Sequence, residues 1–200
     1  MDTDDSYKTI AAIAEGTYTE KRSKFLAFAL PVETVDEVKR YVAEYQKRYY
    51  DARHACYAYM LGAERTDFHA NDNGEPSGTA GKPILGQINS YGLTNILIIV
   101  VRYFGGIKLG TSGLIVAYRQ AAIEALENAT IIEKTVDDDI TFSYEFPMMN
   151  SVMKIVKDMN PQIISQGYDT DCIMTLRIRR GLMPQLRERL LTVDGLRVTE

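Results

Sequence analysis

Ile96-Leu-Ile-Ile-Val-Val101 is followed by the glycine-rich run Arg102-Tyr-Phe-Gly-Gly-Ile-Lys-Leu-Gly110 and then by Thr111-Ser-Gly-Leu-Ile-Val-Ala-Tyr-Arg119. The first segment is apolar throughout and rich in β-branched residues, which predicts a central strand covered on both faces. The glycines of the second segment allow turns and close approaches that a side chain would prevent. This stretch decides the fold, because it predicts a buried strand that runs through a tight loop into a helix.

The start of this expected helix has the features of an anion site. Thr111 or Ser112 is expected to cap the helix, and the helix N-terminus lies beside Arg102 and Lys108, where an anion would be attracted. The alternative is a tight loop whose glycines only turn the chain and whose Lys108 is solvated. No complete phosphate-loop or dinucleotide-binding pattern is present, so the motif alone does not choose between these interpretations.

The composition is typical of a globular protein. The 200 residues are 46% apolar and 25% charged, which allows one domain or two small ones. The apolar run at 96–101 is too short to cross a bilayer, and acids stand where a secretory signal would carry bases, so we expect a cytoplasmic protein without membrane association. Cys56 and Cys172 fall in different expected domains and complete no zinc motif, so we expect neither a disulfide nor a bound metal.

The formal net charge of −4 argues against indiscriminate binding of polyanions, but a whole-chain sum hides local fields. Arg177 and Arg179 share a face of an expected strand, and Asp137-Asp138-Asp139 is expected to supply its opposite charge elsewhere. The sequence therefore predicts a basic face or, alternatively, a solvated sheet face partly neutralised by neighbouring acids. The basic cluster consists of Arg177, Arg179, Arg180, Arg187 and Arg189, with Glu188 among them.

Residues 1–134 are predicted to form a first domain. Thr34 is expected to cap a helix that has Glu37 at its third position and apolar residues along one face. A polar loop at 71–81, with four glycine or proline residues, precedes a shorter helix that carries Pro83 in its first turn. The expected elements are strands at 17–18, 24–30, 55–61, 66–69 and 96–101, and helices at 34–48, 83–89 and 114–129.

Residues 135–200 are predicted to form a second domain, because the pattern of elements restarts near Thr135. The order β-α-β-β-α-β is the split β-α-β arrangement of a small ferredoxin-like domain. The chain as a whole is therefore expected to be α+β, with two domains. The expected elements are strands at 139–144, 162–167, 172–178 and 196–199, and helices at 149–159 and 183–191.

Four motifs of the first domain resemble the YigZ/IMPACT family of small cytoplasmic proteins. They occur in the family's order and spacing, and the second domain resembles the C-terminal module of bacterial members. The motifs are RSKF at Arg22–Phe25, HACYAY at His54–Tyr59, NGEPSGTAGKPIL at Asn73–Leu85 and VRYFGGIKLG at Val101–Gly110.

The resemblance implies a fold for each domain. The first domain is expected to have the fold shared by a ribosomal small-subunit protein domain and domain four of elongation factor G, and the second to be similar to that factor's C-terminal domain. Eukaryotic relatives are linked to control of translation under amino-acid starvation. These links suggest RNA, the ribosome or a protein partner of translational control, but a shared fold suggests a partner by association only.

Two chemical interpretations of the first domain start from its histidines. His54 and Cys56 share a face of a strand, but residues two apart on a strand are about 6–7 Å apart at the backbone, which is long for proton transfer in a Cys-His nucleophilic pair. His69, Asp72 and Glu75 could instead contribute to a hard-metal site, although no spaced set of ligands supports it. We expect no catalytic residue, metal or cofactor.

Glu75 has a further expected role beside Arg102. A loop acid near Arg102 would neutralise the arginine and hold the glycine-rich segments together, whereas an exposed Arg102 would remain available to a phosphate. Tyr103 or Phe104 could stack on an unpaired base, although at least one of the two is expected in the core.

Three hypotheses follow for the function. The leading one is a non-enzymatic, RNA- or ribosome-associated regulator of translation or the stress response. The second is a protein-protein regulatory module, and the third is an enzyme acting on a small phosphorylated or peptide substrate in a Glu75/Arg102 cleft. The oligomeric state is left open. The residues expected to bind an anion or nucleic acid are Arg22, Lys24, His54, Glu75, Arg102, Tyr103, Lys108, Thr111, Ser112, Arg177, Arg179 and Arg180.

Overall fold

The computed structural model describes residues 5–168 and 170–199. The described chain divides into two compact units. The first unit spans Tyr7–Lys134, and the second contains Asp5 and Ser6 together with the chain from Thr135 onward. Both units combine helices with antiparallel sheet, so the fold is mixed α+β.

A five-stranded antiparallel sheet forms the frame of the first unit, in the order β2-β3-β6-β4-β5. The central strand is β6 (Ile96–Tyr103), and its residues from Ile96 to Arg102 are all buried. The predicted central strand, covered on both faces, is thus confirmed. The other strands are β2 (Ala14–Glu20), β3 (Ser23–Pro31), β4 (His54–Leu61) and β5 (Asp67–Asn71).

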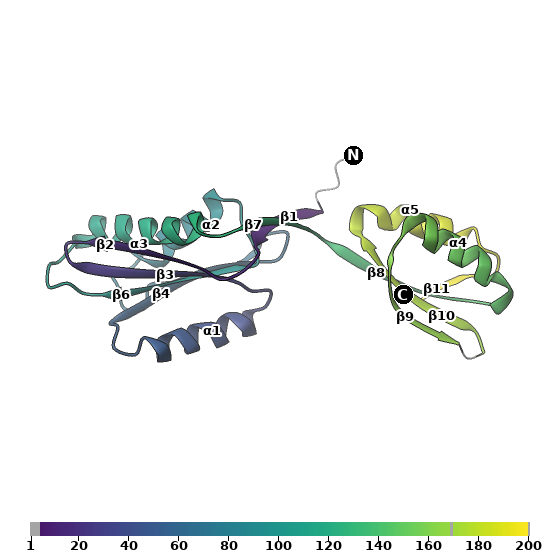
Figure 1. Ribbon diagram of the computed structural model, residues 1–200, viewed down its shortest axis with the longest axis horizontal. Coiled ribbons are helices and arrows are strands. Elements are labelled where there is room, and N and C mark those ends of the chain that lie inside the picture. Colours follow the sequence, from purple (N-terminus) through teal and green to yellow (C-terminus); the bar gives the residue numbers. More distant parts are fainter. Residues whose placement is uncertain (1–4, 169, 200) are drawn as a thin grey trace. The chain divides into compact units, whose positions relative to one another are not determined.

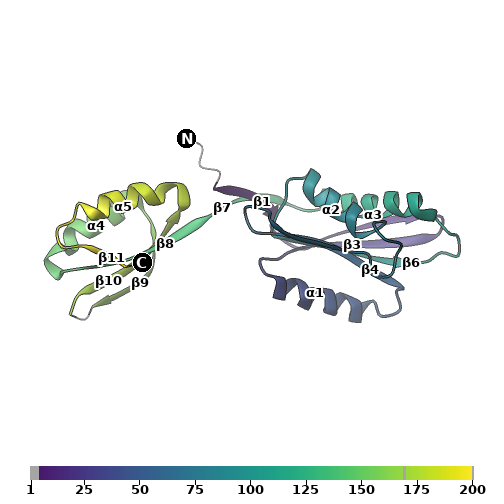
Figure 2. The same cartoon turned by 180° about the vertical axis from the view of Figure 1, so that it is seen from behind.

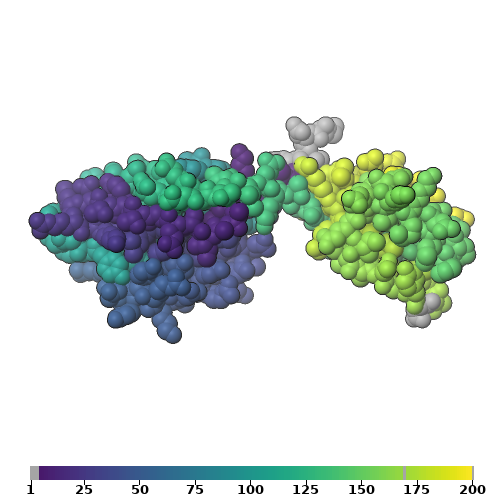
Figure 3. Space-filling model, in the orientation of Figure 1, coloured from purple at the N-terminus to yellow at the C-terminus, as the bar shows by residue number. Residues whose placement is uncertain are grey.

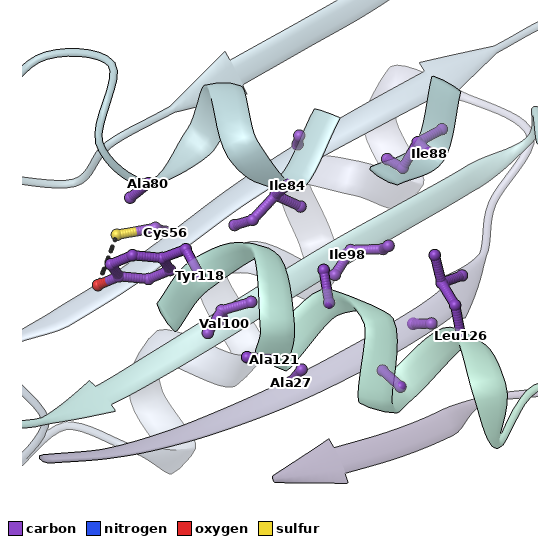
Figure 4. Close-up of a cluster of buried hydrophobic side chains, with 14 of the residues drawn as sticks. Ala27, Cys56, Ala80, Ile84, Ile88, Ile98, Val100, Tyr118, Ala121 and Leu126 are labelled. Carbon is purple, nitrogen blue, oxygen red and sulfur yellow. Dashed lines mark hydrogen bonds between the residues drawn. The ribbon is translucent and has the colours of Figure 1, made fainter. Parts of the chain in front are cut away.

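Helices cover both faces of this sheet, as the two opposite views show (Figures 1 and 2). Helices α2 (Gly81–Ser90) and α3 (Gly110–Glu127) lie on one face, and α1 (Val35–Arg48) lies on the other. Each face has its own buried apolar cluster. The cluster under α2 and α3 joins Ile84 and Ile88 to Ile98 and Val100 of the central strand (Figure 4).

Small residues let α3 lie close to the sheet. Ala117, Ala121 and Ala125 of the helix are fully buried, and Gly16 of β2 faces the helix backbone. A Cβ atom at Gly16 would lie 2.3 Å from the backbone nitrogen of Ala125, so only glycine fits at this crossing. The purple surface of β2 borders the green surface of α3 in the space-filling view (Figure 3).

The helix starts test the capping predictions. Thr34 caps α1 as expected, because its side chain accepts a hydrogen bond from the Glu37 amide at 3.2 Å. The expected capping of the later helix by Thr111 or Ser112 is wrong. Helix α3 begins at Gly110, which has a φ of +73°, and the N-cap position belongs to Leu109, whose side chain accepts no capping bond. Both hydroxyl residues therefore lie inside the first turn.

One pair of strands was not predicted from the sequence. Strands β1 (Ser6–Ile10) and β7 (Ile131–Thr135) form a two-stranded sheet. Both are short segments of mixed polarity, and a strand of this kind depends on its partner rather than on its own pattern. Local patterning therefore gave no signal for either strand.

The second unit has a four-stranded antiparallel sheet in the order β11-β8-β10-β9. Its element order is β-α-β-β-α-β, as predicted. Helices α4 and α5 cover one face (Figure 1), over a separate core that contains Phe142, Val152 and Leu176. The elements are β8 (Asp137–Tyr144), α4 (Met149–Met159), β9 (Gln162–Tyr168), β10 (Cys172–Arg179), α5 (Met183–Leu191) and β11 (Arg197–Thr199), with short 3-10 turns at Phe146–Met148 and Arg180–Leu182.

Candidate functional site

A pocket of about 420 Å³ lies where the central strand β6 passes through the glycine-rich loop into α3. Pockets of about 300–1,000 Å³ are typical of small-molecule sites. Five residues from the expected set meet in its wall: His54, Glu75, Arg102, Lys108 and Thr111. The remaining lining residues are Arg53, Gly74, Pro76, Phe104, Leu109, Gly110 and Leu114.

Sheet register brings the floor of the pocket together. Arg102 of β6 pairs with Phe25 of β3 on one side and with His54 of β4 on the other. The Arg102 guanidinium carbon lies 5.7 Å from the ring centre of Phe25 and 5.7 Å from that of Phe104. Two aromatic rings within about 6 Å stabilise the buried cation.

Glu75 neutralises Arg102 from the loop at 71–81. Its Oε1 atom accepts a hydrogen bond from Arg102 Nη1 at 2.7 Å and another from the Tyr118 hydroxyl at 2.7 Å. The side chains of Glu75 and Arg102 are only 3% and 9% exposed, so this ion pair is desolvated. The expected Glu75–Arg102 pairing is confirmed, and it ties the loop to the central strand and to α3.

Arg102 keeps unused hydrogen-bonding capacity. Its Nε atom is buried and has no hydrogen-bond partner among the described residues, and of the five N–H groups that a guanidinium carries, only one on Nη1 reaches an acceptor. A buried arginine without its full set of partners is costly, and such groups concentrate at functional sites.

His54 presents one ring nitrogen to the pocket. Its Nδ1 atom lies 2.7 Å from the Asn73 carbonyl oxygen, which can only accept, so Nδ1 carries the proton and donates. The other nitrogen, Nε2, is 3.9 Å from Glu75 Oε2. His54 is therefore held by its backbone contact in one orientation, with Nε2 on the side of Glu75.

The Asp72 carboxylate binds backbone amides of its own loop. Its carboxylate accepts hydrogen bonds from the amides of Gly78 at 2.8 Å, Ala80 at 3.1 Å and Gly81 at 2.8 Å, the last two at the start of α2. A carboxylate satisfied by three backbone donors at a helix N-terminus is a structural clamp.

The metal-site alternative does not match the geometry. His69 lies beside Tyr57 and Tyr59 in the groove next to α1, on the sheet face opposite Glu75. No group of three His, Cys, Asp or Glu side chains in the described part of the chain could hold a metal ion.

Cys56 is buried behind the pocket. Its thiol lies 3.0 Å from the Asp72 carbonyl oxygen and 3.4 Å from the Tyr118 hydroxyl (Figure 4). Burial raises the pKa of the Cys56 thiol to about 12 and also raises the pKa of the Tyr118 hydroxyl. A thiol that stays protonated at neutral pH does not act as the nucleophile of a Cys-His pair.

Four of the expected residues of the first unit lie outside this pocket. Arg22 and Lys24 are exposed at the β2–β3 turn and on β3. Tyr103 points to the α1 face, where its hydroxyl donates to Asp51 at 2.8 Å. Ser112 lines a separate hollow with Lys21 and Glu20.

The three arginines of the second unit that were expected to bind an anion are each paired with an acid. Arg177 donates two hydrogen bonds to Asp139 and Arg180 donates two to Asp138, while Arg179 binds the carboxylate of Asp5. The expectation that the acids at 137–139 lie elsewhere is wrong, because β8 and β10 are neighbours and their register sets Arg177 against Asp139. Asp138 and Asp139 of β8 and Asp5 thus supply the acidic partners of these three arginines.

Sequence reasoning missed two residues of the site. Arg53, directly before the His54 motif, lines the pocket, and Tyr118 donates a hydrogen bond to Glu75 behind it. The position of Arg53 next to a motif histidine was the only available signal. Tyr118 gave none, because its partner Glu75 is 43 residues away in the chain.

The electrostatics of the pocket favour an anion. Three cationic side chains, Arg53, Arg102 and Lys108, line it against the single carboxylate of Glu75. The N-terminus of α3 adds the positive end of a helix dipole at Gly110 and Thr111.

Among the described residues, none of the helices is long and apolar enough to span a membrane.

Comparisons with known proteins place the chain among relatives. The family model described as the Impact N-terminal domain matches residues 21–126. The protein named IMPACT family member YigZ of Escherichia coli strain K12 is 31% identical over 172 residues, which are 85% of this chain and 84% of that protein. IMPACT family member YvyE of Bacillus subtilis strain 168 is 37% identical over 129 residues, which are 64% of this chain and 59% of that protein.

A solved structure shares the fold over nearly the whole chain. The crystal structure, described as that of a hypothetical protein, has a TM-score of 0.76 and 29% sequence identity. The alignment covers 97% of this chain and 96% of the other. The fold is therefore shared with a protein of nearly the same extent.

Proposed function

This chain belongs to the IMPACT family, and we propose that it is a non-enzymatic regulator of translation that associates with RNA or the ribosome. The resemblance links eukaryotic members to the control of translation under amino-acid starvation. The proposed setting is the cytoplasm, in a response to stress.

One observation carries the proposal: Arg53, Arg102 and Lys108 converge with the start of α3 on one pocket. Lys108 and Arg53 form no ion pair with any described residue, so their charges are available to phosphate groups.

The domain folds belong to the same proposal. For the second unit we propose the ferredoxin-like fold, supported by its β-α-β-β-α-β order and by a sheet in which the first and third strands lie at the centre. For the first unit we propose the fold of the ribosomal-protein domain and of domain four of elongation factor G. Both assignments agree with a partner among the components of translation, by analogy only.

Co-sedimentation with ribosomes tests the proposal. The protein is incubated with ribosomes at low and at moderate salt, as the wild type, as the Arg53→Ala/Lys108→Ala variant, and as a matched control, Lys39→Ala/Lys47→Ala. The control removes the same charge from exposed positions of α1, on the opposite sheet face. We expect salt-sensitive binding, several-fold weaker in the pocket variant and unchanged in the control, because each lost phosphate contact lowers the salt slope by about one unit.

Two outcomes would contradict the proposal. Absence of binding at low salt would remove the ribosome as partner. Binding that is insensitive to salt and survives in the pocket variant would favour the alternative of a protein-protein regulatory module, whose affinity does not depend on phosphate contacts.

A further inference from the structure

We propose that the pocket binds one phosphomonoester group of a ligand the size of a single nucleotide, either a free nucleotide or the terminal phosphate of an RNA strand. The RNA source rests on the proposed function, whereas the free nucleotide does not.

The Arg102 guanidinium has hydrogen-bond donors that no described residue uses. Arg102 is more than nine-tenths buried in the pocket wall, and among the described residues its single hydrogen-bond acceptor is Glu75. Glu75 Oε1 is shared with Tyr118, so this carboxylate oxygen already accepts two hydrogen bonds. The remaining N–H groups on the Arg102 Nη atoms need a further acceptor, and phosphate oxygens match the planar fork of a guanidinium.

The start of α3 provides a second set of donors at the same place. The helix has 18 residues, no side-chain cap at Leu109, and Gly110 and Thr111 in the pocket wall. The amides of an uncapped first turn lack partners within the helix and point toward an anion. Lys108, one residue before the cap, is exposed and adds a mobile ammonium group to the rim.

The charge balance selects among phosphate groups. Arg53, Arg102 and Lys108 against Glu75 give the pocket a formal charge of +2, with His54 neutral. A phosphomonoester carries about −1.5 to −2 at pH 7, whereas an internal phosphodiester of RNA carries a single negative charge. The terminal group is therefore the better match.

The walls of the pocket fit the organic part of such a ligand. Phe104 is 47% exposed and lines the pocket with Leu109, Leu114 and Pro76. Its ring offers a surface on which a base can stack. The volume of about 420 Å³ holds one nucleotide rather than a continuous strand.

The loop that forms one wall is fixed before any ligand arrives. A Cβ at Gly105 would lie 2.1 Å from the backbone carbon of Arg22, so this glycine packs directly on the β2–β3 turn. The Gly105 amide also donates to the buried Ser23 hydroxyl at 3.2 Å. A preformed wall reduces the ordering cost of binding.

Isothermal titration calorimetry with defined probes tests the inference. The probes are AMP, adenosine, inorganic phosphate, and one RNA decamer prepared with a 5′-phosphate, with a 3′-phosphate, or with hydroxyls at both ends. The proteins are the wild type, Lys108→Ala, Arg53→Ala and the control Lys39→Ala. We expect AMP to bind at least tenfold more tightly than adenosine, and Lys108→Ala to weaken AMP about tenfold while Lys39→Ala changes nothing.

The decamers distinguish the two sources of the phosphate. Tighter binding of a phosphorylated decamer than of the hydroxyl-ended one identifies an RNA terminus, while binding of AMP with no preference among decamers identifies a free nucleotide. Equal binding of AMP and adenosine, loss of AMP affinity in the Lys39→Ala control, or no binding of any phosphorylated probe at millimolar concentration would overturn the inference.

This experiment is independent of the ribosome test. If the protein co-sediments with ribosomes in a salt-sensitive way but binds no phosphomonoester, the further inference fails and the proposed function stands. If AMP binds in the calorimeter while ribosomes do not, the proposed function fails and the pocket keeps its assigned ligand class.

Discussion

The arginines of the pocket in the first unit and those of β10 and the following turn in the second unit differ in burial and in the number of their acidic partners. In the first unit Arg102 is buried with one hydrogen-bonded acceptor, and the neighbouring Arg53 and Lys108 have no ion pair with any described residue. In the second unit Arg177 and Arg180 are half-exposed and each binds an aspartate with two hydrogen bonds. A local excess of positive charge in the sequence therefore does not locate a binding site. Unused hydrogen-bonding capacity in a pocket is the observation on which the proposed site rests.

The physical reason lies in solvation. An exposed Arg–Asp pair is screened by water and salt and contributes little to stability. A desolvated pair such as Glu75–Arg102 is costly to form and more costly to break, because the remaining charge is left buried. The first unit therefore contains an arrangement that stability alone does not require.

The largest expected effect comes from breaking the buried pair. Glu75→Ala leaves Arg102 buried without its counter-charge, and we expect a loss of about 3–5 kcal/mol in the free energy of unfolding. Urea denaturation followed by circular dichroism measures it. Asp139→Ala in the second unit, which breaks an exposed pair, is the matched control and is expected to change stability far less. Similar losses of unfolding free energy in Glu75→Ala and Asp139→Ala would contradict the difference between a buried and an exposed pair.

The next effect concerns the tyrosine behind the pair. Tyr118→Phe removes the hydroxyl that donates to Glu75 at 2.7 Å, and hydrogen bonds to charged groups contribute about 1.5–3 kcal/mol. We expect a loss of this size in urea denaturation. Tyr144→Phe is the control from the second unit, since Tyr144 is equally buried and its hydroxyl makes no hydrogen bond with a described residue. A loss in Tyr144→Phe as large as that in Tyr118→Phe would contradict the assigned network.

A smaller effect follows from the buried thiol. Cys56 is held protonated up to a pKa of about 12 in the folded chain, whereas an unfolded thiol titrates near about 8.5. Above pH 8.5 the unfolded state binds fewer protons, so stability falls by up to about 1.4 kcal/mol for each pH unit. Denaturation series from pH 8 to 10 on the wild type and Cys56→Ala measure the difference in slope. Equal slopes would show that the thiol is not desolvated.

The smallest expected effect belongs to the exposed pairs. Hydrogen bonds from Arg177 lower the pKa of Asp139, and hydrogen bonds from Arg189 lower the pKa of Asp158. Each pair stabilises the folded state above the ordinary aspartate pKa and loses that contribution as the pH falls through the lowered value. Acid titration of the wild type and Asp139→Asn, at low and high salt, tests this. A difference that persists at high salt would mean that the second unit is less screened than its exposure indicates.

The sequence was a good guide to local structure. The apolar run at 96–101, the Thr34 cap and the β-α-β-β-α-β order of the second unit each depend on residues close in the chain, and each is confirmed. The expected Glu75–Arg102 pair is also confirmed, although it joins residues 27 apart. It was found because both residues stand in recognised motifs, not through periodicity.

The errors share one cause. The caps expected at Thr111 and Ser112 are wrong because α3 already begins at Gly110, so its N-cap position is Leu109, two residues before Thr111. Strands β1 and β7 were missed because each depends on the other for its hydrogen bonds. The arginine face of β10 was misjudged because the register of β8 against β10, which sets Asp139 opposite Arg177, is not encoded in either strand alone.

The sequence by itself determined the family, the central strand, the glycine-rich loop and the set of residues from which the site is built. Only the tertiary structure decided which of those residues meet. It brought His54, Glu75, Arg102 and Lys108 together with Arg53 in one pocket, and it neutralised Arg177 and Arg180 with aspartates of the adjacent strand. Periodicity and capping act over a few residues, whereas pairing, burial and electrostatic balance depend on segments that are distant in the chain and become neighbours only in the folded protein.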